Sequence, residues 1–275
     1  MAKLCAYKEN NLDGPFMKIY LDHNLVVYLR NNSSSELSEK IDNHKKLGSD
    51  ILYSPAHLEE IAVSQMRNNV EKETVDKDID FLTALCGKNS IRPISREEVV
   101  IYTEYPRDCY ERVISQYHKN DQAESMEKEF FIDVHKNSTS DPKEMNNYNP
   151  AELFCETLIN KELLLRSLIK NNLISQQEAL ECLQSGSYKI LHNRFCVLEH
   201  SFNYIANWLE MIGYYRESED KSRSRLHDVS HIIYASYSDL FVSNDKKLIK
   251  KAAAIYSILE VQTKVMAMGE YLALE

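Results

Sequence analysis

The hydrophobic positions near the N-terminus follow two patterns, short continuous runs typical of buried strands and runs with helical spacing. Residues 17–21 and 50–53 are short apolar runs, and each predicts a strand. Helical spacing follows each run, and Ser54 and Pro55 suit the N-cap and first turn of a helix. The predicted helices cover residues 24–29, residues 36–47 with Gly48 as the stop, the segment from Pro55, and residues 71–85.

The C-terminal part shows the same two patterns. Asp228 opens a helical pattern, and residues 240–242 then form an apolar run suited to a buried strand. Beyond it we predict a helix over residues 244–258, a strand over residues 263–266 and a helix over residues 269–274. Strands that alternate with helices predict an α/β fold, with a parallel sheet flanked by helices.

The middle of the chain has a different pattern. Residues 96–215 are largely helical by spacing, with interruptions at Pro106, at 137–142 and at 146–150. We interpret this block as a large helical insertion packed on a core made of residues 1–95 and 216–275. Such a block could cover a site, bind substrate or form a protein interface.

Composition places the chain among ordered globular proteins. Of its 275 residues, 27% are charged and 43% are hydrophobic, which is enough apolar material for a substantial core. No apolar run is long enough to cross a bilayer and the start lacks the apolar core of a secretion signal, so we expect a cytoplasmic protein. Six scattered cysteines without a C-x-x-C pair indicate reduced thiols, and argue against a zinc ribbon.

Four carboxylates stand where such a sheet would bring them together. Asp22 and Asp245 follow predicted strands, Glu60 lies on the second turn of the helix after Ser54, and Asp228 opens another helix. The carboxyl ends of parallel strands meet at one edge of a sheet, so these acids can converge there. Carboxylates brought together repel one another, and their oxygens suit Mg²⁺ or Mn²⁺, so a divalent cation is the simplest reason to assemble them.

These four acids resemble the acidic quartet of the PIN-domain family of metal-dependent nucleases. The best-matched piece is the helix of Asp228 followed by the strand that ends at Asp245, which resembles that family's helix aspartate and "TnD" segment. The resemblance covers roughly residues 17–95 and 220–275, and the long middle block departs from the simple family pattern. It implies a PIN-like core, an endoribonuclease acting on RNA or single-stranded DNA, all four acids as catalytic metal ligands, and a toxin or defence role.

Other residues near these acids are candidates for supporting roles. The net charge of −9 argues against a general surface for coating nucleic acid, so substrate binding would depend on local basic groups. Supporting residues around the acids are Asn24, Glu59, Asp239 and Ser243, and those for contacts with nucleic acid are Lys246, Lys247, Arg223 and Arg225.

Several alternatives remain open on the sequence alone. Asp22, Asp228 and Asp245 could each be only a helix N-cap, and Glu59 competes with its neighbour for the metal. His231 could form a mixed metal pair with Asp228 or be a packed helix residue. The chain could also be a non-catalytic PIN-like scaffold that binds a protein partner or regulator through the helical insertion. It could form an oligomer as well. No G-x-S-x-G, P-loop or G-x-G-x-x-G motif supports another enzyme class.

Overall fold

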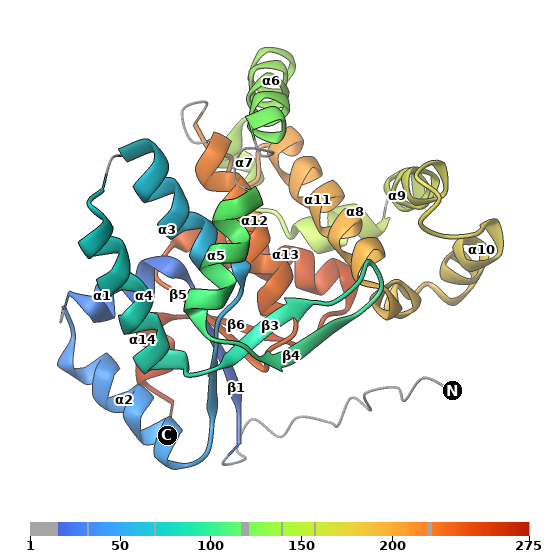
Figure 1. The fold of residues 1–275 in the computed structure, drawn as a ribbon. Coiled ribbons are helices and arrows are strands. Elements are labelled where there is room, and N and C mark those ends of the chain that lie inside the picture. Colours follow the sequence, from blue (N-terminus) through green and yellow to red (C-terminus); the bar gives the residue numbers. More distant parts are fainter. Residues whose placement is uncertain are drawn as a thin grey trace.

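Four parallel strands form the central sheet, in the order β2-β1-β5-β6 (Figure 1). In the central strand, Ile19 pairs with Ile51 on one side and with Leu240 on the other, so segments from both ends of the chain lie side by side. The predicted parallel sheet flanked by helices is confirmed. The strands of this sheet are β1 (Lys18–Leu21), β2 (Asp50–Leu52), β5 (Leu240–Ser243) and β6 (Lys264–Ala267).

The computed structural model describes residues 16–31, 33–68, 70–116, 121–138, 140–156, 158–218 and 222–274. Residues 1–15 therefore lie outside the described residues. The helices are α1 (His23–Arg30), α2 (Ser35–Lys46), α3 (Pro55–Asn68), α4 (Lys72–Cys86), α5 (Pro106–Gln116), α6 (Asp121–Asn137), α7 (Pro142–Met145), α8 (Pro150–Glu156), α9 (Leu158–Lys170), α10 (Gln176–Ser185), the 3-10 helix η2 (Lys189–Asn193), α11 (Phe195–Ile212), α12 (Ser222–Ala235), α13 (Lys246–Leu259) and α14 (Met268–Leu272).

Most predicted helices lie within a few residues of their expected positions. The stop after α2 is at Gly48, whose φ of +90° is a backbone conformation that residues with a Cβ rarely adopt. Within the described parts of the chain, every helix is too short or too polar to span a bilayer. The described cysteines are free thiols, as expected: Cys86, Cys109, Cys155, Cys182 and Cys196.

Both faces of the sheet are buried, because successive side chains of each strand point in opposite directions. Ile19 and Leu21 face a core built with α1 to α5 and α14, whereas Tyr20 between them faces a core built with α8 to α13. The neighbouring strand alternates in the same way, with Val242 on the first side and Phe241 on the second. The fold therefore has three layers, with helices on both sides of the sheet.

The helical block of residues 96–215 supplies much of one of these layers. Phe154 of α8 and Phe202 of α11 are fully buried, in the same hydrophobic cluster as Phe241 of the sheet. The Phe202 ring lies 5.9 Å from that of Tyr256 on α13, centroid to centroid. This block thus covers the sheet directly, and its apolar side chains are continuous with the rest of that core.

The start of this block differs from the sequence expectation. Residues 99–103 form strand β4 (Val99–Thr103), which pairs antiparallel with β3 (Asn89–Pro93) in a two-stranded ribbon. The expectation that helix predominates from residue 96 onward is therefore wrong for these residues. The run Val-Val-Ile-Tyr-Thr is rich in β-branched and aromatic residues, which favour strands.

We expect Phe202→Ala to lower the free energy of unfolding by about 3–5 kcal/mol, because it leaves a cavity in a core shared by sheet and helices. Urea unfolding should show one transition by far-UV circular dichroism and by the fluorescence of Trp208, the single tryptophan. Ile159→Ala is the control, because that side chain is 65% exposed and its loss should change stability by less than about 0.5 kcal/mol. Separate transitions for the two probes would mean that the helical block unfolds independently of the sheet.

Candidate functional site

The ends of β1 and β5 bring two of the predicted acids to the same edge of the sheet. Asp22 directly follows β1, and its backbone N–H donates to the carbonyl of Val242 over 3.0 Å. The Ser243 hydroxyl donates to Asp22 Oδ2 and accepts the backbone N–H of Asp245 at 2.9 Å. One serine, predicted as a supporting residue, thus links the two aspartates.

Both aspartates also cap helices, which was the alternative interpretation of each. Asp22 Oδ1 accepts the N–H of Leu25 at 2.8 Å, at the start of α1. Asp245 Oδ1 accepts the N–H groups of Lys247 and Leu248 at 2.7 and 3.1 Å, at the start of α13. Capping holds each carboxylate in a fixed orientation at the sheet edge, so it is compatible with a role in binding.

Glu60 and Glu59 diverge on α3, as expected for adjacent helical residues. Glu60 Oε1 lies 2.7 Å from His231 Nε2, and its side chain is 26% exposed. Glu59 instead lies among the charges of α5 and α11. Burial raises its pKa to about 7, the charges of Glu60 and Glu199 add to this rise, and Arg112 opposes it. The charge of Glu60 contributes to the raised pKa of Asp22.

Asp228 lies well inside α12, not at its start. The helix begins at Ser222, so the expectation that Asp228 opens it is wrong, and the capping alternative for Asp228 falls with it. The polar residues of the first turns carry no apolar periodicity, which hid the true start. From the middle of the helix, Asp228 is close enough to Lys251 of α13 for that charge to lower its pKa.

The site's electrostatics are unfavourable to ionised acids. Burial raises the pKa of Asp228 to about 8, with Glu60 and Asp245 adding to the rise and Lys251 opposing it. Burial likewise raises the pKa of Asp22 to about 7 despite the hydrogen bonds that favour its ionised form. A nearby cation would favour the ionised form of both.

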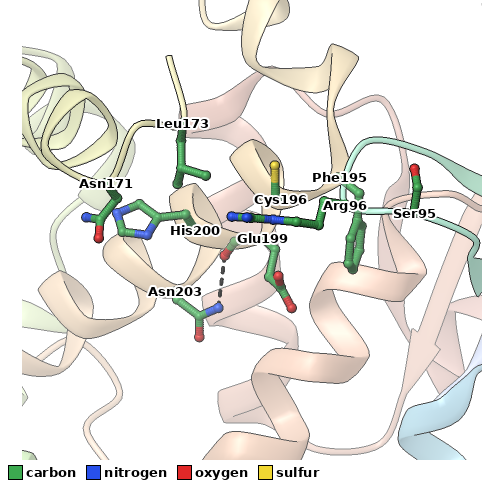
Figure 2. A pocket seen from close by; sticks show the side chains of 9 residues that line it. All are labelled: Ser95, Arg96, Asn171, Leu173, Phe195, Cys196, Glu199, His200 and Asn203. Carbon is green, nitrogen blue, oxygen red and sulfur yellow. Dashed lines mark hydrogen bonds between the residues drawn. The ribbon is translucent and has the colours of Figure 1, made fainter. Parts of the chain in front are cut away.

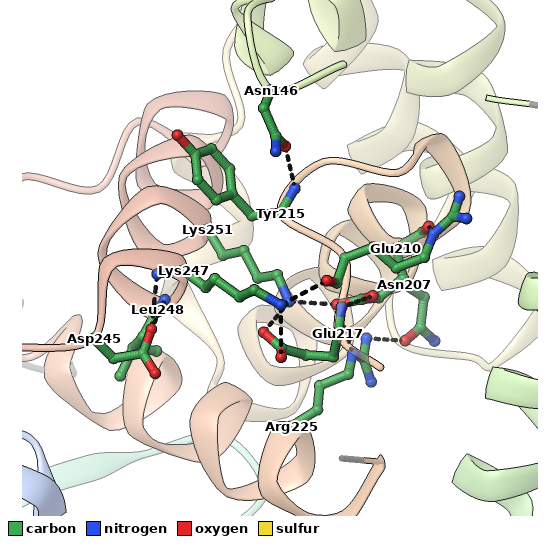
Figure 3. A network of polar contacts seen from close by, with 11 residues as sticks. Asn146, Asn207, Glu210, Tyr215, Glu217, Arg225, Asp245, Lys247, Leu248 and Lys251 are labelled. Carbon is green, nitrogen blue, oxygen red and sulfur yellow. Dashed lines mark hydrogen bonds and ion pairs between the residues drawn. The ribbon is translucent and has the colours of Figure 1, made fainter. Parts of the chain in front are cut away.

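An ion-pair network lies beside Asp245 and Leu248 at the start of α13 (Figure 3). Lys251, Glu210 and Glu217 are each at most 6% exposed, and the lysine ammonium contacts both carboxylates. Lys247 donates to Glu217 over 3.1 Å and to the carbonyl of Arg216 over 2.8 Å. Three buried charges therefore hold the loop before α12 against α13.

This network changes the interpretation of the predicted basic residues. Arg225 is 2% exposed and its guanidinium contacts Glu210 and Asn207, so it is an internal ion-pair residue and not a surface contact for nucleic acid. Lys246 is exposed beside Asp245, whereas Lys247 is held by the network. The side chain of Arg223 lies outside the described residues.

Two further supporting residues are placed differently from the expectation. Asp239 precedes β5, and its carboxylate accepts the N–H of Lys18 at the start of β1 over 2.8 Å. It therefore lies at the opposite end of these strands from Asp22, and a supporting role at the site is wrong for it. Asn24 is exposed on the first turn of α1, near the predicted edge.

The side chains beneath the site include Tyr20, Ser54 and His57, which sequence analysis missed. All are fully or almost fully buried, and they connect to Glu60 through His231. Both ring nitrogens of His231 are engaged in this way, so the alternative of a packed, hydrogen-bonded histidine holds in place of the mixed metal pair. A tyrosine within an apolar strand gives no signal of its polar contacts.

The acids do not form a coordination sphere as they stand. Throughout the described ranges, no three His, Cys, Asp or Glu side chains are close enough together to hold a metal ion. The chemistry of the donor set nevertheless fits a hard divalent cation, because the groups at this edge are carboxylates whose charged forms are destabilised. A bound ion would require the side chains of Asp22, Glu60, Asp228 and Asp245 to move closer together.

A separate hollow of about 660 Å³ lies away from these acids (Figure 2). It is bounded by the loop that carries Arg96, the start of α11 and the connection after α9. Glu199 is its single acid and Phe195 its aromatic wall, and none of the four predicted ligands lines it. Because this hollow has one acid, whereas Asp22 and Asp245 are linked at the sheet edge, the edge remains the candidate site.

In metal-free protein, we expect Asp228→Asn to be more stable than the wild type at pH 8, by roughly 1–3 kcal/mol. The folded pKa of about 8 lies above the ordinary value of 3.8, so this carboxyl contributes stability that is present below pH 3.8 and lost as pH rises through 8. The difference in the free energy of unfolding between variant and wild type, measured in urea, should therefore be smaller at pH 5. Asp141→Asn, an exposed helix cap, should show no such pH dependence. A difference that is the same at both pH values would contradict the raised pKa.

Comparisons of the chain with models of protein families, with the sequences of characterised proteins and with solved structures found no match. The resemblance to PIN domains consequently depends on the four acids and the order of the elements that carry them. The geometry of the sheet edge is therefore the basis for a functional assignment.

Proposed function

We propose that this chain is a Mg²⁺- or Mn²⁺-dependent nuclease that hydrolyses phosphodiester bonds at the edge where β1 and β5 end. The observation that carries this proposal is the link between Asp22 and Asp245 through Ser243, with Glu60 and Asp228 within electrostatic range. In open parallel sheets, ligands bind outside the carboxyl ends of the strands, where these acids lie.

In this proposal the role of each acid follows from its contacts. Asp22 and Asp245 are the principal ligands, since both are held by backbone N–H groups. Asp228 and Glu60 complete the metal site, and Glu60 orients the attacking water. A bound cation would supply the charge that activates water and stabilises the attacking and leaving oxygens.

Substrate contacts would come from the few cations near this edge. Lys246 is exposed directly after Asp245, so its ammonium is available to a phosphate beside the acids. The preference for RNA over single-stranded DNA, and a role as a toxin or defence effector, derive from the resemblance to the PIN family.

A non-catalytic scaffold is the competing function, and one observation favours it: no three acids of the described part of the chain assemble around a metal position. A scaffold would bind its partner through the helical block. There, Ile159 and Leu163 of α9 and Leu180 of α10 are exposed, at 65%, 47% and 46%. Metal binding distinguishes the two functions.

We expect Mn²⁺ at about a hundredfold excess over its Kd to stabilise the wild type by about 2.7 kcal/mol, which is a rise of several degrees in Tm. Asp245→Asn should lose most of this rise and the cleavage of RNA, while remaining folded, because asparagine caps α13 about as well. Asp239→Asn, at the opposite end of the strands, is the matched control and should retain both. A wild type that neither gains stability from millimolar Mn²⁺ nor cleaves RNA would favour the scaffold.

The two adjacent glutamates give a second test. Glu60→Gln should lower kcat for RNA cleavage by about 10²- to 10⁴-fold, because it removes the charge assigned to the attacking water. Glu59→Gln should leave kcat within about threefold of the wild type, since that side chain faces Arg112 and Glu199. Equal losses in the two variants would show that Glu60 has no special role.

A further inference from the structure

A series of buried and partly buried hydrogen bonds connects Ser54, the residue before α3, to the candidate site. The Ser54 hydroxyl lies 2.7 Å from the hydroxyl of Tyr20, which lies 2.7 Å from His231 Nδ1. His231 Nε2 lies 2.7 Å from Glu60 Oε1. Ser54 directly precedes the helix that carries Glu60, so the path starts beside the N-terminal end of α3, crosses β1 and α12, and ends on α3.

The partners fix the direction of each hydrogen bond. The Glu60 carboxylate can only accept, so His231 carries its proton on Nε2 and its Nδ1 is an acceptor. Tyr20 must then donate its O–H to Nδ1, which leaves its oxygen to accept from Ser54. All donors point towards Glu60, so the bonds reinforce one another.

The surroundings of His231 hold its ring in one orientation. Tyr20 and His231 are at most 2% exposed, and their ring centroids are 5.7 Å apart in an edge-on arrangement. The ring of His57 lies 4.8 Å away at 85°. Nε2 donates to Glu60 and Nδ1 accepts from Tyr20, so the ring is a neutral donor with a defined tautomer.

His57 has a similar position but a different connection. Its Nδ1 accepts the backbone N–H of Ser54 at 3.2 Å, so its proton is on Nε2, which donates to the carbonyl of Leu21 over 2.9 Å. It therefore contacts the end of β1 and, at 3.4 Å, the Tyr20 hydroxyl, but makes no hydrogen bond to the four acids. The two histidines share burial, ring contacts and neutrality, but only His231 contacts an acid of the site.

We propose that His231 and Tyr20 are positioning residues, which hold the Glu60 carboxylate in the orientation that the nuclease site requires. Asp22 and Asp245 are oriented by helix N–H groups, whereas Glu60 lies on the second turn of α3, beyond the free N–H groups of its own helix. The imidazole supplies the missing donor, and Tyr20 holds the other side of the ring by donating to its Nδ1. This inference rests on the proposed function, because it assigns a role relative to that site.

The test compares His231→Leu, which removes the donor, with His231→Gln, which supplies an amide donor in its place. With Mn²⁺ and RNA, we expect kcat of His231→Leu to be 10- to 100-fold lower than that of the wild type, with little change in KM. His231→Gln should recover most of the loss. Tyr20→Phe, which keeps the ring and removes the hydroxyl, should lower kcat by less than His231→Leu does. His200→Gln is the matched control, because that ring bonds to Ser167 at the separate hollow, and it should leave kcat unchanged.

A readout that needs neither metal nor activity separates this inference from the nuclease proposal. ¹⁵N NMR of the metal-free protein should show His231 as the neutral tautomer protonated on Nε2, and Tyr20→Phe should change its Nδ1 signal. A wild type without cleavage or a Mn²⁺ shift would overturn the nuclease function and this role with it, even if the tautomer is as expected. A cleaving wild type with unchanged kcat in His231→Leu, or with the other tautomer, would overturn the positioning role alone.

Discussion

The pairing of β1 with β5 is the constraint on which the rest of the molecule depends. It joins Ile19 to Leu240 and so closes a loop that contains most of the chain. The entropic cost of closing a loop rises only by about 0.6 kcal/mol for each doubling of its length. Burial of both faces of the sheet under helices can therefore offset even this closure. Asp22, Ser243 and Asp245 meet only because this pairing exists.

The candidate site combines groups that the fold holds tightly with groups that the fold destabilises. Asp22 is 1% exposed and receives two hydrogen bonds, yet burial still raises its pKa to about 7. Asp228 has the higher pKa, with the Lys251 charge as the cation that opposes its rise. A bound cation would lower both pKa values, because a nearby opposite charge favours the ionised form.

Local patterns were enough to predict the parallel sheet, most helices and the arrival of Asp22 and Asp245 at one edge. Burial on both faces gives parallel strands recognisable apolar runs. Residues that directly follow two neighbouring parallel strands lie at the same edge of the sheet and so near one another. The direction of Glu60 relative to Glu59 depends on the rotation of α3, which only its packing decides. Errors were concentrated where distant contacts determine the outcome.

Arg225 illustrates this limit, since nothing in its neighbourhood in the sequence indicates that Glu210 would bury it. Asp239 was misplaced although it precedes the strand, which by the rule used for Asp22 and Asp245 puts it at the opposite end of β5. The hydrogen bonds from Ser54 through Tyr20 and His231 to Glu60 could not be predicted for the same reason as the burial of Arg225, since these residues come from distant parts of the sequence. Strand β4 is different, because its β-branched run was a local signal that the helical pattern around it obscured.

The order of the strands in the sheet also has a consequence for biosynthesis. Because β1 pairs with β2 early but with β5 only after residue 240 has been made, one edge of the central strand lacks its partner through most of translation. An unpaired apolar strand edge is a template for association with other chains. Until β5 emerges from the ribosome, this edge should therefore need protection by chaperones or by the helices already synthesised.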